Sequence, residues 1–216
     1  MSRRPALSRD RIVEAAARVA DHDGLGGVSM RSVGKELGVE AMSLYHHVAG
    51  KEDLLDRLAD WVFTGIELPS PDQPWRRAMA ERAASARSVL SRHPWALSLI
   101  ESRRNPGPAL LSHHDTVLGC LRSNGFSVRL ASHAFSAIDA YVYGFVLTEL
   151  TLPFEPGETV DDFVSGIELP AEAYPYLAEM MTEQVLGQEY SYGDEFDYGL
   201  GLILDGLEER LGRAGD

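Results

Sequence analysis

Two short helical patterns meet at a glycine between residues 29 and 48, and this stretch constrains the fold more than any other part of the chain. The first pattern opens at Ser29, a residue type whose side-chain oxygen caps helix N-termini, and ends at Gly38. Because glycine has no Cβ, it adopts the left-handed conformation that ends many helices. We predict the second helix over residues 41–48. Two helices joined by so short a turn form a helix-turn-helix, whose second helix enters the major groove in DNA-binding versions of the unit.

Helical patterns on both sides of this stretch can complete a small core. Upstream, Ser8 can cap a helix that has apolar residues on one face and is closed by Gly24. Downstream, residues 52–63 repeat leucine and valine at helical spacing. Gly34 lies four residues before Gly38, where a side chain would separate crossing helices, so we predict a close packing contact there. Three helices are therefore expected to enclose one core.

Four short motifs follow one another in this region at a specific spacing. They are Ser29-Met30-Arg31, Leu37-Gly38-Val39, Ser43-Leu44-Tyr45-His46-His47-Val48 and Lys51-Glu52-Asp53-Leu54-Leu55. In order and spacing they match the DNA-binding domain of the tetracycline-repressor (TetR) family, and residues 8–63 resemble that domain. A looser likeness to the regulatory domain of the tetracycline repressors continues through residues 124–127, 134–147 and 199–208.

The resemblance implies a set of residues near bases or their flanking phosphates. Arg31 can make the bidentate contact to guanine, which is worth about 1 to 3 kcal/mol of discrimination; a surface salt bridge with Glu36 or Glu40 is the alternative. Hydroxyl groups and lysine suit phosphates, which position a protein without specifying sequence. Consecutive histidines on a helix point about 100° apart, so we expect no shared metal ion. The predicted DNA contacts are Ser29, Arg31, Ala41, Met42, Ser43, Tyr45, His46, His47 and Lys51.

Helical patterns continue through the remainder of the chain, and no convincing alternating strand pattern competes with them. The predicted fold class is therefore all-α. We expect two domains: residues 1–63, a three-helix DNA-binding domain with its linking helix, and residues 64–216, a larger effector-binding and dimerisation domain. After a proline-rich link, further helices are predicted over residues 75–93, 108–124, 128–151, 171–186 and 194–211, with a short helix opening at Pro94 and a mobile loop over residues 153–170.

The net charge of −13 is unexpected for a protein that meets anionic DNA. Residues 1–60 hold nine Arg or Lys against ten Asp or Glu, so −12 of the charge falls on residues 61–216. The acidity therefore lies outside the predicted DNA-binding domain. The N-terminus has no apolar signal region and the chain has no run of about 18 apolar residues, so we expect a cytoplasmic protein without a membrane partner.

Enzyme chemistry is not indicated by any motif. The sequence has no nucleophile–base pair, metal cluster or glycine-rich phosphate loop, so we expect no enzyme activity, no metal and no cofactor. The single cysteine, Cys120, cannot form an internal disulfide and lies in a helical pattern. A buried, inert thiol is expected there.

The larger domain is expected to bind a small-molecule effector in a mainly apolar cavity with a few polar groups. Tyr141 and Phe145 on one face of a long helix, with Asp139 and Glu149 nearby, are the best candidates; each residue taken alone is also compatible with core or surface. The predicted effector-binding residues are Trp95, Leu99, Ile100, His113, Phe135, Asp139, Tyr141, Phe145, Glu149 and Met180.

A broad apolar stripe with interspersed glycines runs along the last helix. Small residues admit a second helix closely, and the resemblance implies that this helix and the one at 128–151 pair with their counterparts in a four-helix bundle. Ordinary core packing is the alternative. The predicted dimer residues are Phe196, Leu200, Ile203, Leu204, Leu207 and Leu211.

Together these features predict a bacterial, ligand-responsive repressor that binds palindromic double-stranded operator DNA as a homodimer. A DNA-binding regulator or architectural protein without a ligand is the alternative. The tetracycline repressor holds its drug through magnesium, supported by a histidine and a glutamate, and our alignment places Ile100 and Thr148 at those positions. We therefore expect an apolar or aromatic effector other than magnesium-tetracycline.

Overall fold

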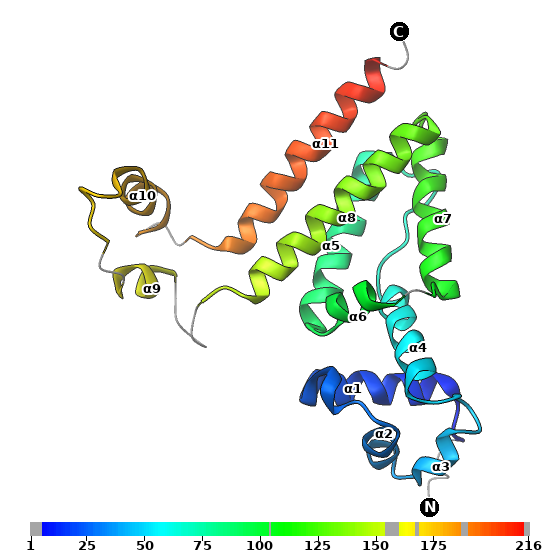
Figure 1. The fold of residues 1–216 in the computed structure, drawn as a ribbon. Helices are drawn as coiled ribbons and strands as arrows, with labels where there is room; N and C mark the ends of the chain where they lie inside the picture. Colours follow the sequence, from blue (N-terminus) through cyan, green and yellow to red (C-terminus); the bar gives the residue numbers. More distant parts are fainter. Residues whose placement is uncertain (1–5, 104, 154–159, 167–168, 187–189, 214–216) are drawn as a thin grey trace, which may run out of the picture. The chain divides into compact units, whose positions relative to one another are not determined.

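The computed structural model describes residues 6–103, 105–153, 160–166, 169–186 and 190–213, and these ranges contain helices and no strands, as predicted (Figure 1). By internal packing the chain divides into two compact units, Met1–Val146 and Leu147–Asp216. The functional boundary that we place between residues 63 and 64 stays a prediction.

The first unit begins with four helices: α1 (Arg9–Gly27), α2 (Met30–Leu37), α3 (Ala41–Leu44) and α4 (Lys51–Thr64). Helix α1 starts where predicted, because the Arg11 N–H donates to the Ser8 side chain at 3.3 Å. Gly24, at φ 68° and ψ 175°, interrupts α1 before a final turn. Ile12, Leu44 and Leu58 are fully buried and form the centre of this small core.

The turn between α2 and α3 has the geometry that its glycines predict. Ser29 and Ser32 form a reciprocal capping box that begins α2, and Gly38 ends it at φ 66° and ψ 39°. A Cβ built on Gly34 would lie 3.0 Å from the Val39 carbonyl oxygen and 3.3 Å from the Ala41 Cα. Only a residue without a side chain therefore lets α2 approach the start of α3 this closely.

The second helix of the pair is shorter than the 41–48 range that we predict. Helix α3 ends at Leu44, and the chain continues in a tightened turn in which the His47 and Val48 N–H groups both donate to the Leu44 carbonyl. The Arg9 Nε donates to the His47 carbonyl at 3.0 Å, an acceptor that a continuing helix would use for itself. This hydrogen bond from Arg9 of α1 therefore favours an end of α3 before His47.

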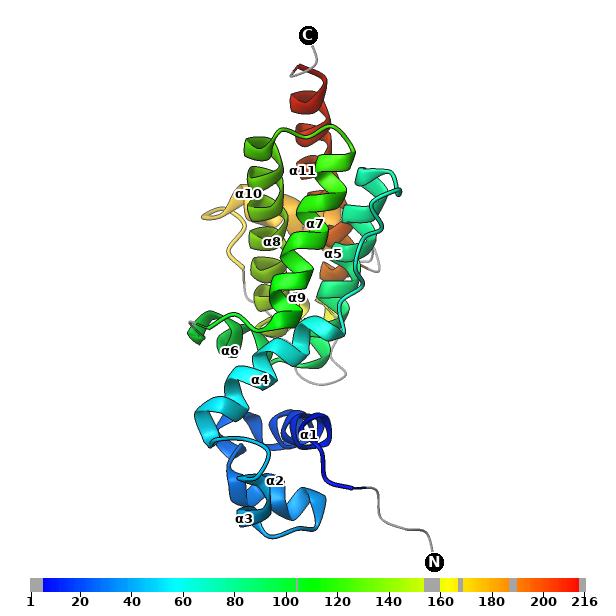
Figure 2. The same cartoon turned by 90° about the vertical axis from the view of Figure 1, so that its right-hand side faces the viewer.

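The larger part of the first unit consists of α5 (Trp75–Arg92), α6 (Ala96–Ser102), α7 (Pro108–Ser123) and α8 (Val128–Leu150), whose last turn extends beyond the unit. Both views show α5, α7 and α8 as neighbours (Figure 2). Their shared core includes Met79, Leu121 and Ile138, and Cys120 is buried in it as expected. In the described ranges α8 is the one helix long and apolar enough to cross a membrane, yet Ile138 and its buried neighbours pack into this core.

Three side chains, Asp21, Asp60 and Arg103, connect α1 and α4 to this larger part. Asp21 of α1 accepts from His93 Nδ1 at 2.7 Å and from Trp95 Nε1 at 2.6 Å. Asp60 of α4 accepts from the Ala109 and Leu110 N–H groups at 3.2 and 2.9 Å, at the N-terminus of α7. Arg103 pairs with Glu52 at 2.9 Å and with Asp56 at 3.3 Å. A shift of α7 or of the residues after α6 therefore reaches α4 directly.

The second unit contains α9 (Val160–Gly166), α10 (Pro175–Met180), a wider turn over Met181–Val185, a short 3₁₀ helix over Tyr192–Asp194, and α11 (Glu195–Arg213). The mobile loop predicted over 153–170 is wrong in part, because α9 forms inside it. Phe163 and Val164 are partly buried in α9, and packing of such an apolar pair stabilises a short helix. The prolines, glycines and acidic residues of the segment indicate a loop because composition does not include this packing. Residues 154–159 and 167–168 lie outside the described residues.

Candidate DNA-binding and effector-binding sites

Residues 41–48, which we call the recognition segment, are oriented by two buried side chains. Leu44 is 0% exposed and Val48 is 2% exposed, so both anchor the segment in the core. Met42 and Tyr45 point outward, with 73% and 48% of their surface exposed, and His46 is also exposed. Ala41, Ser43 and His47 are partly exposed. The segment thus presents a polar and aromatic face. Ser29 lies outside it, and its side chain accepts a hydrogen bond from the Ser32 N–H to cap α2.

Two exposed cations lie on the helices before and after the recognition segment. Arg31 is exposed, and in the described part of the chain no carboxylate lies within 4 Å of it, because Glu36 instead pairs with Arg18 at 2.7 Å. The salt bridge considered as the alternative for Arg31 is absent from these residues. Lys51 is exposed at the first position of α4. Both cations are therefore free to meet anionic groups outside the protein.

A buried polar cluster lies in the larger part of the first unit and consists of Arg82, His113 and Asp139, which are 3%, 1% and 9% exposed. The Arg82 Nε donates to His113 Nε2 at 3.2 Å, and Arg82 Nη2 donates to Asp139 Oδ1 in a short ion pair. These residues come from α5, α7 and α8. The cluster joins three helices through two hydrogen bonds.

His113 is neutral in this cluster. Burial, reinforced by the positive charges of Arg82 and His114, lowers the pKa of His113 from 6.5 to about 3. Because its Nε2 accepts from Arg82, its proton resides on Nδ1. His113 therefore offers a buried N–H donor.

Aromatic rings surround the polar cluster. The Phe63 ring lies 5.5 Å from that of His113, and the His114 ring lies 4.6 Å from Phe135, edge to face. The Arg82 guanidinium lies 5.4 Å from the Phe135 ring centroid. Burial raises the pKa of the Tyr143 hydroxyl, and the Asp139 carboxylate raises it further. Charge, polar donors and aromatic faces are thus concentrated in one place.

The cluster and its adjoining rings bring together three predicted effector residues, His113, Phe135 and Asp139. Tyr141 and Phe145 contact each other with ring centroids 5.9 Å apart. Leu99 is buried in α6 and Glu149 is partly buried in α8. Trp95 bonds to Asp21 of α1, which gives it a structural partner. Met180 is exposed and belongs to the second unit.

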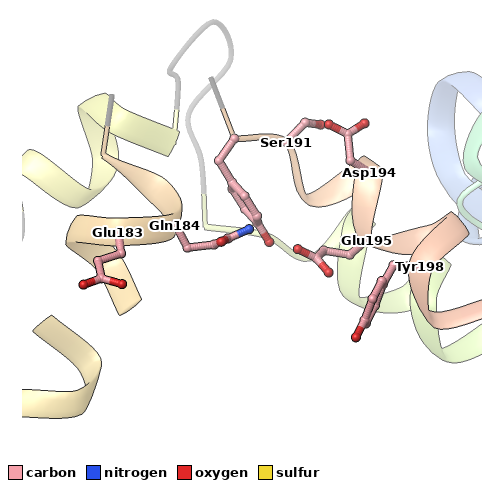
Figure 3. A pocket seen from close by; sticks show the side chains of 7 residues that line it. Glu183, Gln184, Ser191, Asp194, Glu195 and Tyr198 are labelled. Atoms are coloured by element: carbon pink, nitrogen blue, oxygen red, sulfur yellow. The ribbon is translucent and has the colours of Figure 1, made fainter. Parts of the chain in front are cut away.

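Three surface hollows accompany these sites. One of about 210 Å³ lies among α4, α6 and α7 and includes Ile100, the one predicted effector residue that lines any of the three. One of about 770 Å³ lies among α1, α4 and residues 105–108. One of about 580 Å³ belongs to the second unit, and Figure 3 shows the carboxylates of Glu183, Asp194 and Glu195 around it. Carboxylate residues line all three hollows, and the hollow of about 580 Å³ differs most from the mainly apolar cavity expected for an effector.

The predicted dimer residues occupy two environments on α11. Phe196, Leu200, Leu204 and Leu207 are buried within the single chain, which agrees with ordinary core packing, and Ile203 and Leu211 are partly buried. The large apolar side chains that α11 exposes are Tyr198 and Leu202, at 69% and 58%. The interface stays a prediction, and its exposed apolar contribution comes from residues that the sequence pattern did not single out.

Arg82 was also missed by sequence reasoning. It lies on the face of α5 that buries Trp75, Met79, Ala86 and Val89. A single charged residue inside such an apolar stripe must find partners in the core, because an unpaired buried charge is costly. This break in the pattern is the signal that could have identified it.

The neutral state of His113 predicts a pH-dependent stability. Between pH 6.5 and about 3 the unfolded chain binds a proton at this residue that the folded chain does not, so the free energy of unfolding falls as the pH drops through this window. At pH 5 the loss attributable to His113 is about 2 kcal/mol. Urea unfolding of wild type and His113→Leu at pH 7 and pH 5 measures it. An equal loss in both proteins would contradict the assignment, because their carboxylates and His114 are shared.

Comparison with known proteins identifies the family of this chain. Residues 12–58 match the family described as bacterial regulatory proteins, tetR family, and residues 68–211 match the tetracyclin repressor-like C-terminal domain. The HTH-type transcriptional repressor DrrR1 of Streptomyces coeruleorubidus is 37% identical, over 95% of this chain and 78% of its own length.

Two further proteins are similar over nearly their whole length. The class D tetracycline repressor protein of Escherichia coli is 26% identical, over 95% of this chain and 91% of its own. The crystal structure of ActR from Streptomyces coelicolor in complex with actinorhodin is 27% identical and superimposes with a TM-score of 0.76, covering 96% of this chain and all of ActR. With both family domains matched along its length, the chain belongs to the TetR family of bacterial transcriptional regulators.

Proposed function

We propose that the protein is a repressor that binds a palindromic operator as a homodimer and is released from it by a small molecule. The observation that carries the proposal is the recognition segment, in which Leu44 and Val48 are buried and Tyr45 is exposed. The helices before and after it carry the exposed cations Arg31 and Lys51, for which the described residues provide no ion pair. The repressor DrrR1 supports the direction of regulation. The complex of ActR with actinorhodin supports release by a ligand.

The roles of the DNA contacts follow from their chemistry. Arg31 reads guanine with its two parallel donors, and Met42 and His47 lie against base edges. Ser43, Tyr45 and Lys51 hold phosphates, which fix the register of the segment. Because no carboxylate in the described ranges occupies Arg31, binding requires no ion pair to be broken there.

A dimer explains how a small DNA-binding domain reaches useful affinity. Two recognition segments about 34 Å apart read two half-sites roughly 10 bp apart on one face of the duplex. Tyr198 and Leu202 expose apolar surface on α11 that a second copy can cover. The operator is then a palindrome whose symmetry matches that of the dimer.

Ligand binding is proposed to act through the contacts of α4 with α7. A ligand shifts the equilibrium between two arrangements only by its difference in affinity for them. Ligand contacts on α7 and α8 reach α4 through Asp60, which accepts from two N–H groups at the α7 N-terminus. A coupling of about 1 to 3 kcal/mol, roughly 5- to 150-fold, changes operator occupancy substantially.

Magnesium does not fit the residues at the positions that support it in the tetracycline repressor. Ile100 offers only aliphatic carbons, and the Thr148 hydroxyl is a weaker ligand than a carboxylate. We therefore infer that the effector is held by protein groups without a metal.

Selection of bound duplexes from a random pool, followed by a compound screen on the selected duplex, tests the proposal. Enrichment of a palindrome with half-sites about 10 bp apart is expected, as is a compound that releases the dimer from it. A pool without any enriched sequence would refute operator binding. An enriched operator that no compound releases would refute the ligand response and favour a regulator without an effector.

A further inference from the structure

The polar cluster of Arg82, His113 and Asp139 has hydrogen-bonding capacity that the protein does not use. In the part of the chain that the structure describes, Arg82 Nη1 and His113 Nδ1 are buried and have no hydrogen-bond partner. Nearly all buried donors in folded proteins are paired, so two such groups in one cluster require an explanation. The bond between Arg82 Nε and His113 Nε2 holds the two residues together.

The charges and the unpaired donors of the cluster determine which ligand group can bind to it. Asp139 already neutralises the Arg82 guanidinium, and His113 is neutral. A full carboxylate added here would be buried beside the Asp139 carboxylate, which like charges disfavour. Neutral or weakly acidic oxygens, one for each of the two unpaired N–H groups, accept these hydrogen bonds without that repulsion.

The rings beside the cluster indicate the shape of the group that carries this oxygen. Phe63 lies against His113, and Phe135 lies against His114 and the Arg82 guanidinium. Aromatic side chains interact favourably with planar rings, by offset stacking or edge to face. Planar ligands with oxygen at their edge satisfy both the rings and the donors.

We propose that Arg82 and His113 donate hydrogen bonds to carbonyl or phenolic oxygens of a planar aromatic effector, of the chemical class of the hydroxyquinones. The inference rests on the proposed function and specifies the ligand of its sensing domain. It adds a directional polar anchor to the mainly apolar cavity with a few polar groups that the sequence predicts. Arg82 is the residue that distinguishes this class from aromatic hydrocarbons of equal size.

Two probes of similar shape separate the polar anchor from simple apolar binding. 1,8-Dihydroxyanthraquinone carries carbonyl and phenolic oxygens, whereas anthracene has the same fused rings and none. Binding of each to the full-length dimer is measured by quenching of tryptophan fluorescence. Wild type should bind the quinone at least tenfold more tightly than anthracene. Equal affinity for the two probes, or no binding of either, would overturn the proposal.

Variants then assign the selectivity to the cluster. His113→Leu removes one free donor and leaves the Arg82–Asp139 pair intact. The double variant Arg82→Met with Asp139→Leu replaces the whole ion pair by apolar groups of similar size, a change that folded proteins tolerate well. Each should bind the quinone about tenfold more weakly and anthracene within twofold of wild type. Arg92→Met, an exposed position at the end of the same helix, should change neither affinity.

Measuring operator binding as well as ligand binding separates the test of the ligand site from the test of the proposed repressor function. Both cluster variants should bind the selected duplex as wild type does, which also verifies that they are folded. Variants that retain full selectivity for the quinone would overturn the role of the cluster even if the repressor is active. Selective quinone binding by a protein that selects no duplex would instead support the site and contradict the repressor.

Discussion

A protein carrying Tyr45→Ala and Lys51→Ala should bind its selected operator at least 100-fold more weakly than wild type and unfold at the same temperature. Tyr45 is 48% exposed and Lys51 is exposed, so neither substitution opens the core. In the proposed dimer the two changes occur in both protomers and remove four of the proposed phosphate contacts. A 100-fold loss corresponds to about 2.7 kcal/mol, which is modest for four contacts of which two are charged.

The salt dependence of operator affinity shows how much of this loss comes from phosphate contacts. Each lysine that neutralises a phosphate adds close to one unit to the slope of log affinity against log salt, so Lys51→Ala alone should reduce the slope by about two in the dimer. Arg77→Ala, at an exposed position of α5 outside the recognition segment, is the matched control and should leave the slope unchanged. Gel-shift titration at several salt concentrations gives both numbers. Unchanged affinity of the double variant would remove the recognition segment from the interface.

Gly34→Val should abolish specific operator binding and destabilise the protein by about 1 to 3 kcal/mol. A Cβ at this position would already lie 3.0 Å from the Val39 carbonyl oxygen and 3.3 Å from Ala41, and valine adds two more carbon atoms. The atoms in the way belong to the backbone, so they cannot be relieved by a rotamer change. The start of α3 must move, and the recognition segment moves with it.

The matched control for this variant is Gly119→Val in α7. Gly119 lies inside a helix, and a Cβ there meets nothing within 4 Å. The same substitution should therefore be neutral or slightly stabilising, because glycine is the poorer helix former. Thermal unfolding and operator titration of both variants measure these changes in stability and in operator affinity. Equal behaviour of the two would show that the close approach at Gly34 is unimportant.

Local rules predict the DNA-binding helices well. Ser8, Ser29 and Gly38 each set a helix boundary through a cap whose chemistry is encoded at one position, and the structure confirms all three. The end of α3 at Leu44 could not be predicted in this way. It is coupled to a bond from Arg9, 38 residues away from His47, and no local pattern contains such a contact.

The buried polar cluster of Arg82, His113 and Asp139 was anticipated only in part, for a related reason. His113, Phe135 and Asp139 were identified by residue type on the relevant helices, but the residue that joins His113 and Asp139, Arg82, reads as an ordinary solvated arginine in an arginine-rich helix. Its partners are 31 and 57 residues away. Pairing across three helices emerges only when the helices are assembled.

The contact between Trp95 and Asp21 equips the protein with an internal optical reporter. Trp95 is 7% exposed, and its indole N–H donates to a carboxylate of α1, the helix that also holds the recognition segment through Arg9. Any motion that separates α1 from the α5–α6 turn breaks the hydrogen bond between Trp95 and Asp21 and exposes the indole to solvent. Solvent exposure shifts tryptophan emission to longer wavelength. With Trp61 and Trp75 replaced by phenylalanine, one fluorophore would follow the movement of the DNA-binding helices in real time, without a label.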